Sequence, residues 1–312
     1  DRIAGVPPTA AVLNSMASQI DSGNALAAAL QATDDANFYT VTLKNFATPW
    51  TNREFDKFAP LNDYTATVIG MVRDDRDFRQ VLSADVLYVG ADNLGLPAYS
   101  VNDNAHYVAL ESGGFNLKTG LEARVQSSLM GIPSDATAGV LTSRAAAKAF
   151  FFKGTNRAMF RFTMVNHLCT DLEQIKDITR PPDRIRQDVS RSPGGDSRIF
   201  LNNCIGCHSG MDPMVQAFAH YDFSGTDEAR DAAGRLTYDA SKVVDKYHIN
   251  KNNFEWGYVT PDDHWNNYWR AGQNTYLGWS SSLPGAGTGA KSLGEELANS
   301  DAFAKCQVEK VF

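Results

Sequence analysis

The feature that constrains this chain most is a short motif in its second half, which reads Cys204-Ile205-Gly206-Cys207-His208. A Cys-x-x-Cys-His run is the attachment sequence of c-type haem. Two thiols on one helical turn can form thioethers with the vinyl groups of the porphyrin, and the adjacent imidazole can bind the iron. The motif therefore predicts one covalent haem c, with Cys204 and Cys207 as thioether residues and His208 as the proximal iron ligand.

Other uses of these cysteines fit the sequence less well. A structural zinc site needs a second ligand pair at zinc spacing, and neither Cys169 nor Cys306 belongs to such a pair. A thioredoxin-like redox motif follows a strand in a βαβ unit. The residues before Cys204 instead predict the first turns of a helix that begins near Asp196. Because haem c is attached outside the reducing cytoplasm, we expect a periplasmic, extracellular or surface-associated protein.

The two remaining cysteines, Cys169 and Cys306, lie far apart in the sequence. Exported proteins tend to pair their thiols, so we expect a disulfide between these two residues. It would tie the helix before the haem region to the C-terminal helix. The alternative is two buried free cysteines, which pack well as small hydrophobic residues.

The composition sets the broad class of the protein. A hydrophobic fraction of 43% and a charged fraction of 21% are typical of a globular chain. No apolar run approaches the roughly 20 residues that cross a bilayer, although association with a membrane surface stays open. A net charge of −7 disfavours a nucleic-acid partner. The chain starts without the apolar segment of a signal peptide, so we expect that an export signal was removed. Whether the gene product continues past Phe312 stays open.

The hydrophobic pattern predicts a mainly α fold with irregular loops and little β structure. We expect a helical region over residues 1–182, packed on a cytochrome c-like haem region over 196–312. A polar linker over about 183–195 would join them within one cooperative unit. Residues 89–135 are rich in Gly, Pro, Asn and Ser, which predicts irregular structure with a short hairpin around Gly113-Gly114. Apolar residues at helical spacing predict helices over 9–20, 24–32, 37–46, 61–73, 78–88, 143–178 and 292–312, with a break near Gly154.

The residues around the motif carry a family resemblance. The run from Arg198 through the motif to Ser209-Gly210-Met211-Asp212-Pro213, followed by Ala217-Phe218 and Tyr221-Asp222, resembles exported cytochrome-like proteins of planctomycetes and marine proteobacteria. The segments 78–89, 138–142 and 303–308 are similar to further motifs of that family. The resemblance covers most of the chain from about residue 76 onward. It implies a monohaem redox protein and names no settled substrate.

The second axial position decides what such a haem does, since a Met ligand raises its potential and a His ligand lowers it. The sequence has no Met beyond Met214. His248 follows His208 at a distance that lets the chain cross the haem edge and return, so we expect His248 to be the distal ligand. The alternatives that the sequence leaves open are Met211, His220, His264 and the pair Met164 and His167.

An aromatic cluster follows the motif. Its members can pack around the porphyrin, form a local core or stack on a sugar, and we favour the first two. They are Trp256, Tyr258, Trp265, Tyr268, Trp269, Tyr276 and Trp279.

Three functions fit these features. We expect an electron-transfer cytochrome with a redox partner protein. The alternatives are a haem enzyme of a peroxidase-like or oxygen-activating kind, assisted by Arg270 or His264, and a redox or ligand sensor subunit.

Overall fold

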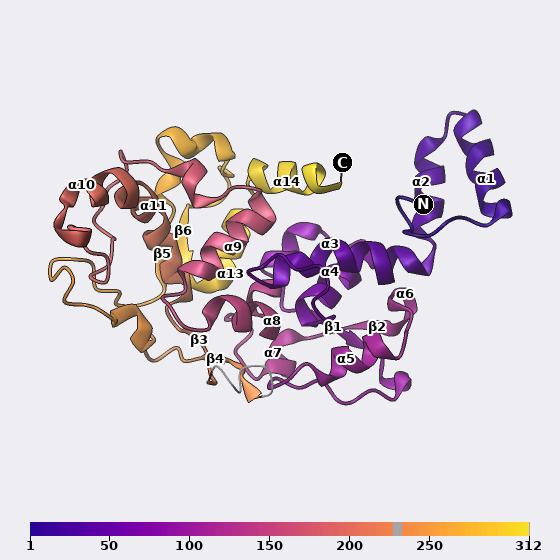
Figure 1. Cartoon of the computed structure of the whole chain (residues 1–312), viewed down its shortest axis with the longest axis horizontal. Coiled ribbons are helices and arrows are strands. Elements are labelled where there is room, and N and C mark those ends of the chain that lie inside the picture. Colours follow the sequence, from indigo (N-terminus) through magenta and orange to yellow (C-terminus); the bar gives the residue numbers. More distant parts are fainter. Residues whose placement is uncertain (227–232, 312) are drawn as a thin grey trace. The chain divides into compact units, whose positions relative to one another are not determined.

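A computed structural model of the chain describes residues 1–226 and 233–311 (Figure 1). Helices account for 52% and strands for 7% of the structure, which confirms the mainly α prediction. The chain forms two compact units. The predicted linker over 183–195 lies inside the second unit. The first unit comprises Asp1–Phe78, Val86–Ser100 and Asn104–Arg124, and the second comprises Arg79–Asp85, Val101–Asp103 and Val125–Phe312.

The first unit is built around one buried helix. Its elements are α1 (Ala10–Asp21), α2 (Ala25–Thr33), α3 (Lys44–Ala47), α4 (Asp63–Arg73), β1 (Leu87–Gly90), α5 (Ala105–Ser112), α6 (Leu117–Gly120) and β2 (Leu121–Arg124). Helix α4 is buried from Asp63 to Met71. Its Gly70 lies directly under the ring of Tyr88 in β1, so any larger side chain would overlap that ring.

Two predictions for this part of the chain are wrong. The helix expected over 78–88 ends at Leu82 as a single 3-10 turn, and β1 follows. All four residues of β1 are buried, and such a continuous apolar run cannot be told from a buried helix by periodicity. Gly113-Gly114 closes α5 rather than a hairpin. The antiparallel partner of β1 is β2, with Leu87 opposite Arg124.

The second unit contains the motif. Its elements are α7 (Gln126–Met130), α8 (Arg144–Ala146), α9 (Arg157–Leu168), α10 (Ser197–Ile199), α11 (Ile205–Val215), β3 (Tyr221–Phe223), β4 (Leu236–Tyr238), β5 (His264–Asn266), β6 (Ala286–Thr288), α13 (Gly289–Ala298) and α14 (Asp301–Val311). Helix α11 packs against α9, and α9 packs against α14. Strand β3 pairs with β4 and β5 pairs with β6, both antiparallel.

The two long helices predicted for this unit are interrupted. The chain leaves the helical conformation near Gly154, as predicted, because Lys153 and Gly154 take left-handed backbone angles. Helix α9 then ends at Leu168, earlier than the predicted residue 178, because Cys169 is also left-handed, with φ of 52°. The C-terminal helix is two helices, α13 and α14, separated at 299–300.

The predicted disulfide between Cys169 and Cys306 is present. The two Cα atoms lie 5.2 Å apart, within the range that a disulfide requires. The bond joins the end of α9 to α14. The Nε2 of Gln307 also donates a hydrogen bond to the carbonyl oxygen of His167 at 3.1 Å. The alternative of two buried free cysteines is therefore wrong, and both ends of the bridge belong to one unit.

Across residues 1–226 and 233–311, the helices are too short or too polar for any of them to span a membrane.

Candidate functional site

The motif lies inside a helical run rather than at its start. The run begins at Asp196, whose side-chain oxygen accepts a hydrogen bond from the backbone N–H of Arg198 at 2.9 Å. This start confirms the prediction of a helix beginning near Asp196. A π-helical turn, Phe200–Cys204, then leads into α11. π-helical turns occur frequently at functional sites. A thioredoxin-like motif would instead use the first turn of a helix to lower the pKa of its thiol.

The two motif cysteines are both free thiols in the structure, but their surroundings differ. Cys204 is half-buried and Cys207 is buried. The Cys207 Sγ lies 3.4 Å from the carbonyl oxygen of Leu172. Burial, together with the nearby Glu173, raises the pKa of Cys207 to about 11. Cys207 is thus protonated at neutral pH, which is the opposite of the thiolate that a redox-active cysteine uses.

Two glycines let α11 approach its neighbours closely. The carbonyl oxygen of Gly206 accepts a hydrogen bond from the backbone N–H of Asp177 at 3.0 Å. Gly210 lies against the indole of Trp269, and a side chain at this position would overlap the ring. These contacts fix the motif helix on one side and leave the side that carries Cys204 and His208 partly exposed.

One partly exposed side of the motif helix carries apolar side chains. Leu201, Cys204, Ile205 and His208 follow helical spacing and share one side. Leu201 is 53% exposed. Ile178, which lies beside Gly206, is 69% exposed. This side thus carries one motif thiol, the imidazole and apolar side chains, which are the kinds of group that suit an apolar macrocycle such as haem. The second motif thiol, Cys207, is buried beside the carbonyl oxygen of Leu172.

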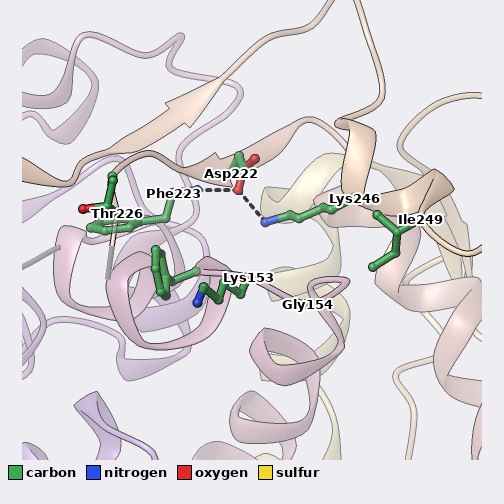
Figure 2. Close-up of a pocket in the computed structure, with 9 residues that line it drawn as sticks. Lys153, Gly154, Asp222, Phe223, Thr226, Lys246 and Ile249 are labelled. Carbon is green, nitrogen blue, oxygen red and sulfur yellow. Dashed lines mark hydrogen bonds and ion pairs between the residues drawn. The ribbon is translucent and has the colours of Figure 1, made fainter. Parts of the chain in front are cut away.

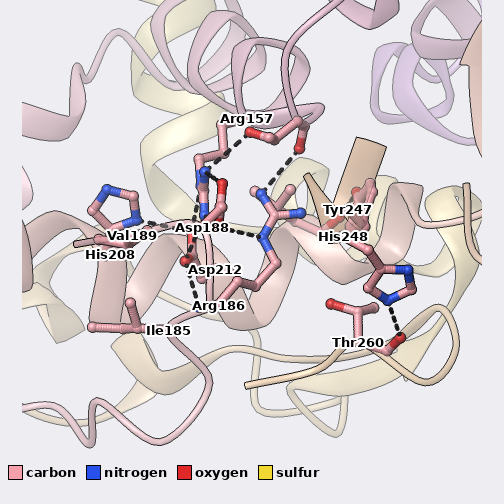
Figure 3. A network of polar contacts seen from close by, with 12 residues as sticks. Arg157, Ile185, Arg186, Asp188, Val189, His208, Asp212, Tyr247, His248 and Thr260 are labelled. Atoms are coloured by element: carbon pink, nitrogen blue, oxygen red, sulfur yellow. Dashed lines mark hydrogen bonds and ion pairs between the residues drawn. The ribbon is translucent and has the colours of Figure 1, made fainter. Parts of the chain in front are cut away.

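His208 has a carboxylate partner one turn along the same helix. Its Nδ1 lies 3.1 Å from Oδ1 of Asp212, whose side chain is fully buried (Figure 3). Burial by itself raises the pKa of Asp212, but Arg157 and His208 outweigh it and hold this pKa well below its ordinary value. The ionised carboxylate can only accept, so the imidazole proton sits on Nδ1. The Nε2 lone pair is then the one available to an iron.

Arg157 of α9 binds Asp212 and a second carboxylate, Asp188. Its Nε and Nη2 lie 2.8 and 3.0 Å from the two oxygens of Asp212. Its Nη1 and Nη2 lie 2.7 and 3.0 Å from those of Asp188. The fifth N–H donates to Oγ1 of Thr155 at 3.0 Å. All five guanidinium donors are therefore used, which gives this group one orientation.

A second guanidinium, which is buried, completes the network. Arg186 is 1% exposed and lies 4.3 Å from the ring centroid of Tyr247. Its backbone N–H points to Oδ2 of Asp212 at 3.4 Å, and its Nη2 donates to the carbonyl oxygen of Thr155 at 3.2 Å. The two carboxylates thus face two arginines, so their charges are compensated without His208.

His248 does not lie next to His208 in the structure. Figure 3 shows the two rings on opposite sides of the network, with Tyr247 on the His248 side. The Nε2 of His248 is 3.3 Å from the carbonyl oxygen of Thr260. In this conformation His248 has the surroundings of a hydrogen-bonded structural residue, and its role as distal ligand stays a prediction.

The other candidate ligands have varied surroundings. Met211 and Met214 are buried on α11. Met164 is buried in α9, and His167 is buried beside it and stacks on Phe303 with ring centroids 6.3 Å apart. Burial holds the pKa of His167 well below its ordinary value.

His264 and His220 lie in other parts of the second unit. His264 is exposed in β5, and its backbone N–H donates a hydrogen bond to Oδ1 of Asp262 at 2.9 Å. His220 is buried, with its Nδ1 2.7 Å from the carbonyl oxygen of Lys242.

Arg270, named above as a helper for an enzyme, is bound to a buried acid. Its Nη2 lies 2.7 Å from Oε2 of Glu296, and its Nε lies 2.8 Å from Oε1.

The members of the aromatic cluster differ in exposure. Trp265 and Trp269 are buried and form local core, whereas Trp256 is 79% exposed.

A cavity of about 570 Å³ lies elsewhere in the second unit (Figure 2). Lys153, Asp222, Lys246 and Ile249 are among its lining residues. The Nζ of Lys246 lies 2.6 Å from Oδ1 of Asp222, so this cation is already paired. The lining residues are separate from the motif, and the cavity has no part in the proposal below.

Asp212, Arg157 and Asp188 have no role in the predictions made from the sequence. The spacing of His208 and Asp212, four residues apart on a helix, was a usable signal for that pair. Arg157 and Asp188 come from distant parts of the chain and carried no local signal.

Within the described ranges, groups of three or more His, Cys, Asp or Glu side chains arranged to hold a metal ion are not found. Comparison with protein-family models, with curated proteins and with solved structures finds no match. The family resemblance of the motifs therefore stays an expectation.

Proposed function

We propose that this chain is an exported c-type cytochrome that transfers electrons through one covalently attached haem. The observation that carries the proposal is the Cys-x-x-Cys-His motif on a helix whose histidine keeps its Nε2 lone pair available. The disulfide between Cys169 and Cys306 supports the oxidising compartment that the proposal requires.

Each residue of the motif has its own role in holding the cofactor. Cys204 and Cys207 would form the thioethers, and Nε2 of His208 would bind the iron. Haem supplies reversible one-electron exchange when it is bound. Asp212 keeps the imidazole proton on Nδ1, and the close contact of Gly210 with Trp269 holds the helix in place. His248 is the proposed distal ligand, and it would have to move to reach that position.

Haem staining of the denatured protein tests the attachment. The full chain is produced with an export signal in a host that matures c-type cytochromes. The Cys204→Ser/Cys207→Ser double variant should lose the stain. The matched control, Cys169→Ser/Cys306→Ser, removes the same number of cysteines and should keep the stain. An unstained wild-type chain, beside a control cytochrome that stains, would refute the proposal.

A haem enzyme or sensor is the second candidate, and the contact between His208 and Asp212 favours it specifically. A carboxylate on the proximal imidazole increases its basicity, which suits oxidised iron. Carbon monoxide separates the candidates. A reduced protein whose low-spin spectrum ignores carbon monoxide supports electron transfer, whereas rapid binding supports an enzyme or sensor with an open iron.

The distal ligand is tested in the same spectra. His248→Ala should shift the ferric spectrum toward high spin and allow carbon monoxide to bind. His264→Ala and Met164→Ala are the controls and should stay low-spin. If the spectrum of His248→Ala is unchanged and that of one control variant shifts to high spin, the control residue is the distal ligand.

A further inference from the structure

We infer that Asp212 is a positioning residue that lowers the reduction potential of the iron bound by His208. This inference rests on the proposed haem attachment, and it adds a role for residues outside the motif. The network of Asp212, Arg157 and Asp188 lies directly behind the proximal histidine (Figure 3).

Asp212 acts on the iron through its hydrogen bond with the imidazole of His208. An imidazole that donates its Nδ1–H to a carboxylate is a more basic ligand than one that donates to a neutral acceptor. The more basic Nε2 of His208 stabilises ferric iron over ferrous iron. The contact of 3.1 Å between Nδ1 and Asp212 should therefore make the haem harder to reduce.

Asp212 is held as a carboxylate by geometry. Its Oδ1 accepts hydrogen bonds from Nδ1 of His208 at 3.1 Å and from Nε of Arg157 at 2.8 Å. Its Oδ2 accepts hydrogen bonds from Nη2 of Arg157 at 3.0 Å and from the backbone N–H of Arg186 at 3.4 Å. Every neighbour in this set is a donor, so a proton on either oxygen would face another proton.

The carboxylate cannot turn away. Arg157 grips both of its oxygens, and the same guanidinium is anchored on its other edge by Asp188 and Thr155. Two charged side chains from outside α11, Arg157 at 18% and Asp188 at 7% exposure, thus orient one carboxylate. A histidine that served only in packing would need neither.

The test is the midpoint potential of the holoprotein, measured by spectroelectrochemical titration. Asp212→Asn keeps the size of the side chain but replaces the charged acceptor with a neutral one. The equilibrium constant for reduction should rise about tenfold or more, which corresponds to roughly 59 mV per tenfold for one electron.

Asp188→Asn is the matched control. It removes the same charge from the same arginine but leaves the bond between His208 and Asp212 in place. Its shift should be less than about a third of that of Asp212→Asn. Equal shifts in the two variants would overturn the inference, because the effect would then be one of charge in general.

A second variant covers the case in which Asp212→Asn does not fold. Asp212→Glu keeps the charge and moves the carboxylate by one methylene, so it should also raise the potential, by a smaller amount. An unchanged potential in this variant would overturn the inference. A wild-type chain without haem would instead refute the proposed function, so the two failures are distinguishable.

Discussion

Two histidines of the second unit, each on a helix, have opposite surroundings. His167 in α9 is fully buried, stacks on Phe303 of α14, and lies two residues from a cysteine that closes a disulfide. His208 in α11 is partly exposed, has a carboxylate behind it, and lies beside two free cysteines. The region around His167 is a packed core in which its own side chains fill the surroundings of the imidazole. The region around His208 presents donor atoms and apolar side chains that its own chain leaves partly uncovered.

The difference shows that burial alone is a poor guide to which histidine binds a cofactor. Burial lowers the pKa of His167 and keeps it neutral, but its apolar neighbours serve packing. His208 combines an oriented proton, a lone pair and neighbouring thiols. Variants that perturb each region separately test this difference.

The largest effect on stability is expected in the region of the disulfide. The Cys169→Ala/Cys306→Ala variant should lose roughly 4–5 kcal/mol of unfolding free energy, because the bridge closes a long loop in the unfolded chain. Urea unfolding of the wild-type and variant proteins checks this. A loss below about 1 kcal/mol would show that the packing of α9 on α14 alone holds this region together.

The second effect concerns the contact that fixes the motif helix. Gly210→Ala places a methyl group against the buried indole of Trp269 and should cost about 1–3 kcal/mol by overpacking. Gly131→Ala tests a glycine with open space around it, where any loss comes from its left-handed backbone rather than from a clash. Pairing Gly210→Ala with Trp269→Phe should recover part of the loss. No recovery would argue against this contact.

The third effect is a pH dependence that belongs to His167. Its pKa is lowered in the folded protein, so below about pH 6.5 the unfolded chain binds more protons than the folded one. The contribution of the neutral His167 to the free energy of unfolding should therefore be complete above this pH. Below it, the free energy of unfolding should fall by about 1.4 kcal/mol for each unit by which the pH drops. Urea unfolding at pH 7.5 and 5.5 measures the loss.

His167→Phe is the matched variant for that titration. It should reduce the dependence between pH 7.5 and 5.5, because the phenyl ring cannot take up a proton. An unchanged dependence in this variant would assign the effect to other groups.

The secondary structure of the two units shows how far sequence reasoning reaches. Local patterns predicted the helix that starts near Asp196 and the break near Gly154. The disulfide between Cys169 and Cys306 was predicted because these two cysteines lie outside the motif of an expected exported protein. They failed at Leu87–Gly90, where a fully buried strand has no alternation that distinguishes it from a helix. They also missed the early end of α9, because a left-handed cysteine has no signal in composition.

The candidate site was predictable only where its residues are close in the sequence. The motif identified Cys204, Cys207 and His208 as a group. The network behind His208 depends on Arg157 and Asp188, which tertiary folding brings to Asp212 from outside α11. The surroundings of His248 likewise depend on the carbonyl of Thr260, which spacing alone could not show.

The most direct test of the central claim is the mass of one tryptic peptide. Cleavage after Arg198 and Arg230 yields a peptide that holds both motif cysteines and His208. From an exporting host that matures c-type cytochromes, this peptide should carry the mass of one haem, and its two cysteines should resist alkylation. A peptide of unmodified mass with two alkylated cysteines would contradict covalent haem at the motif.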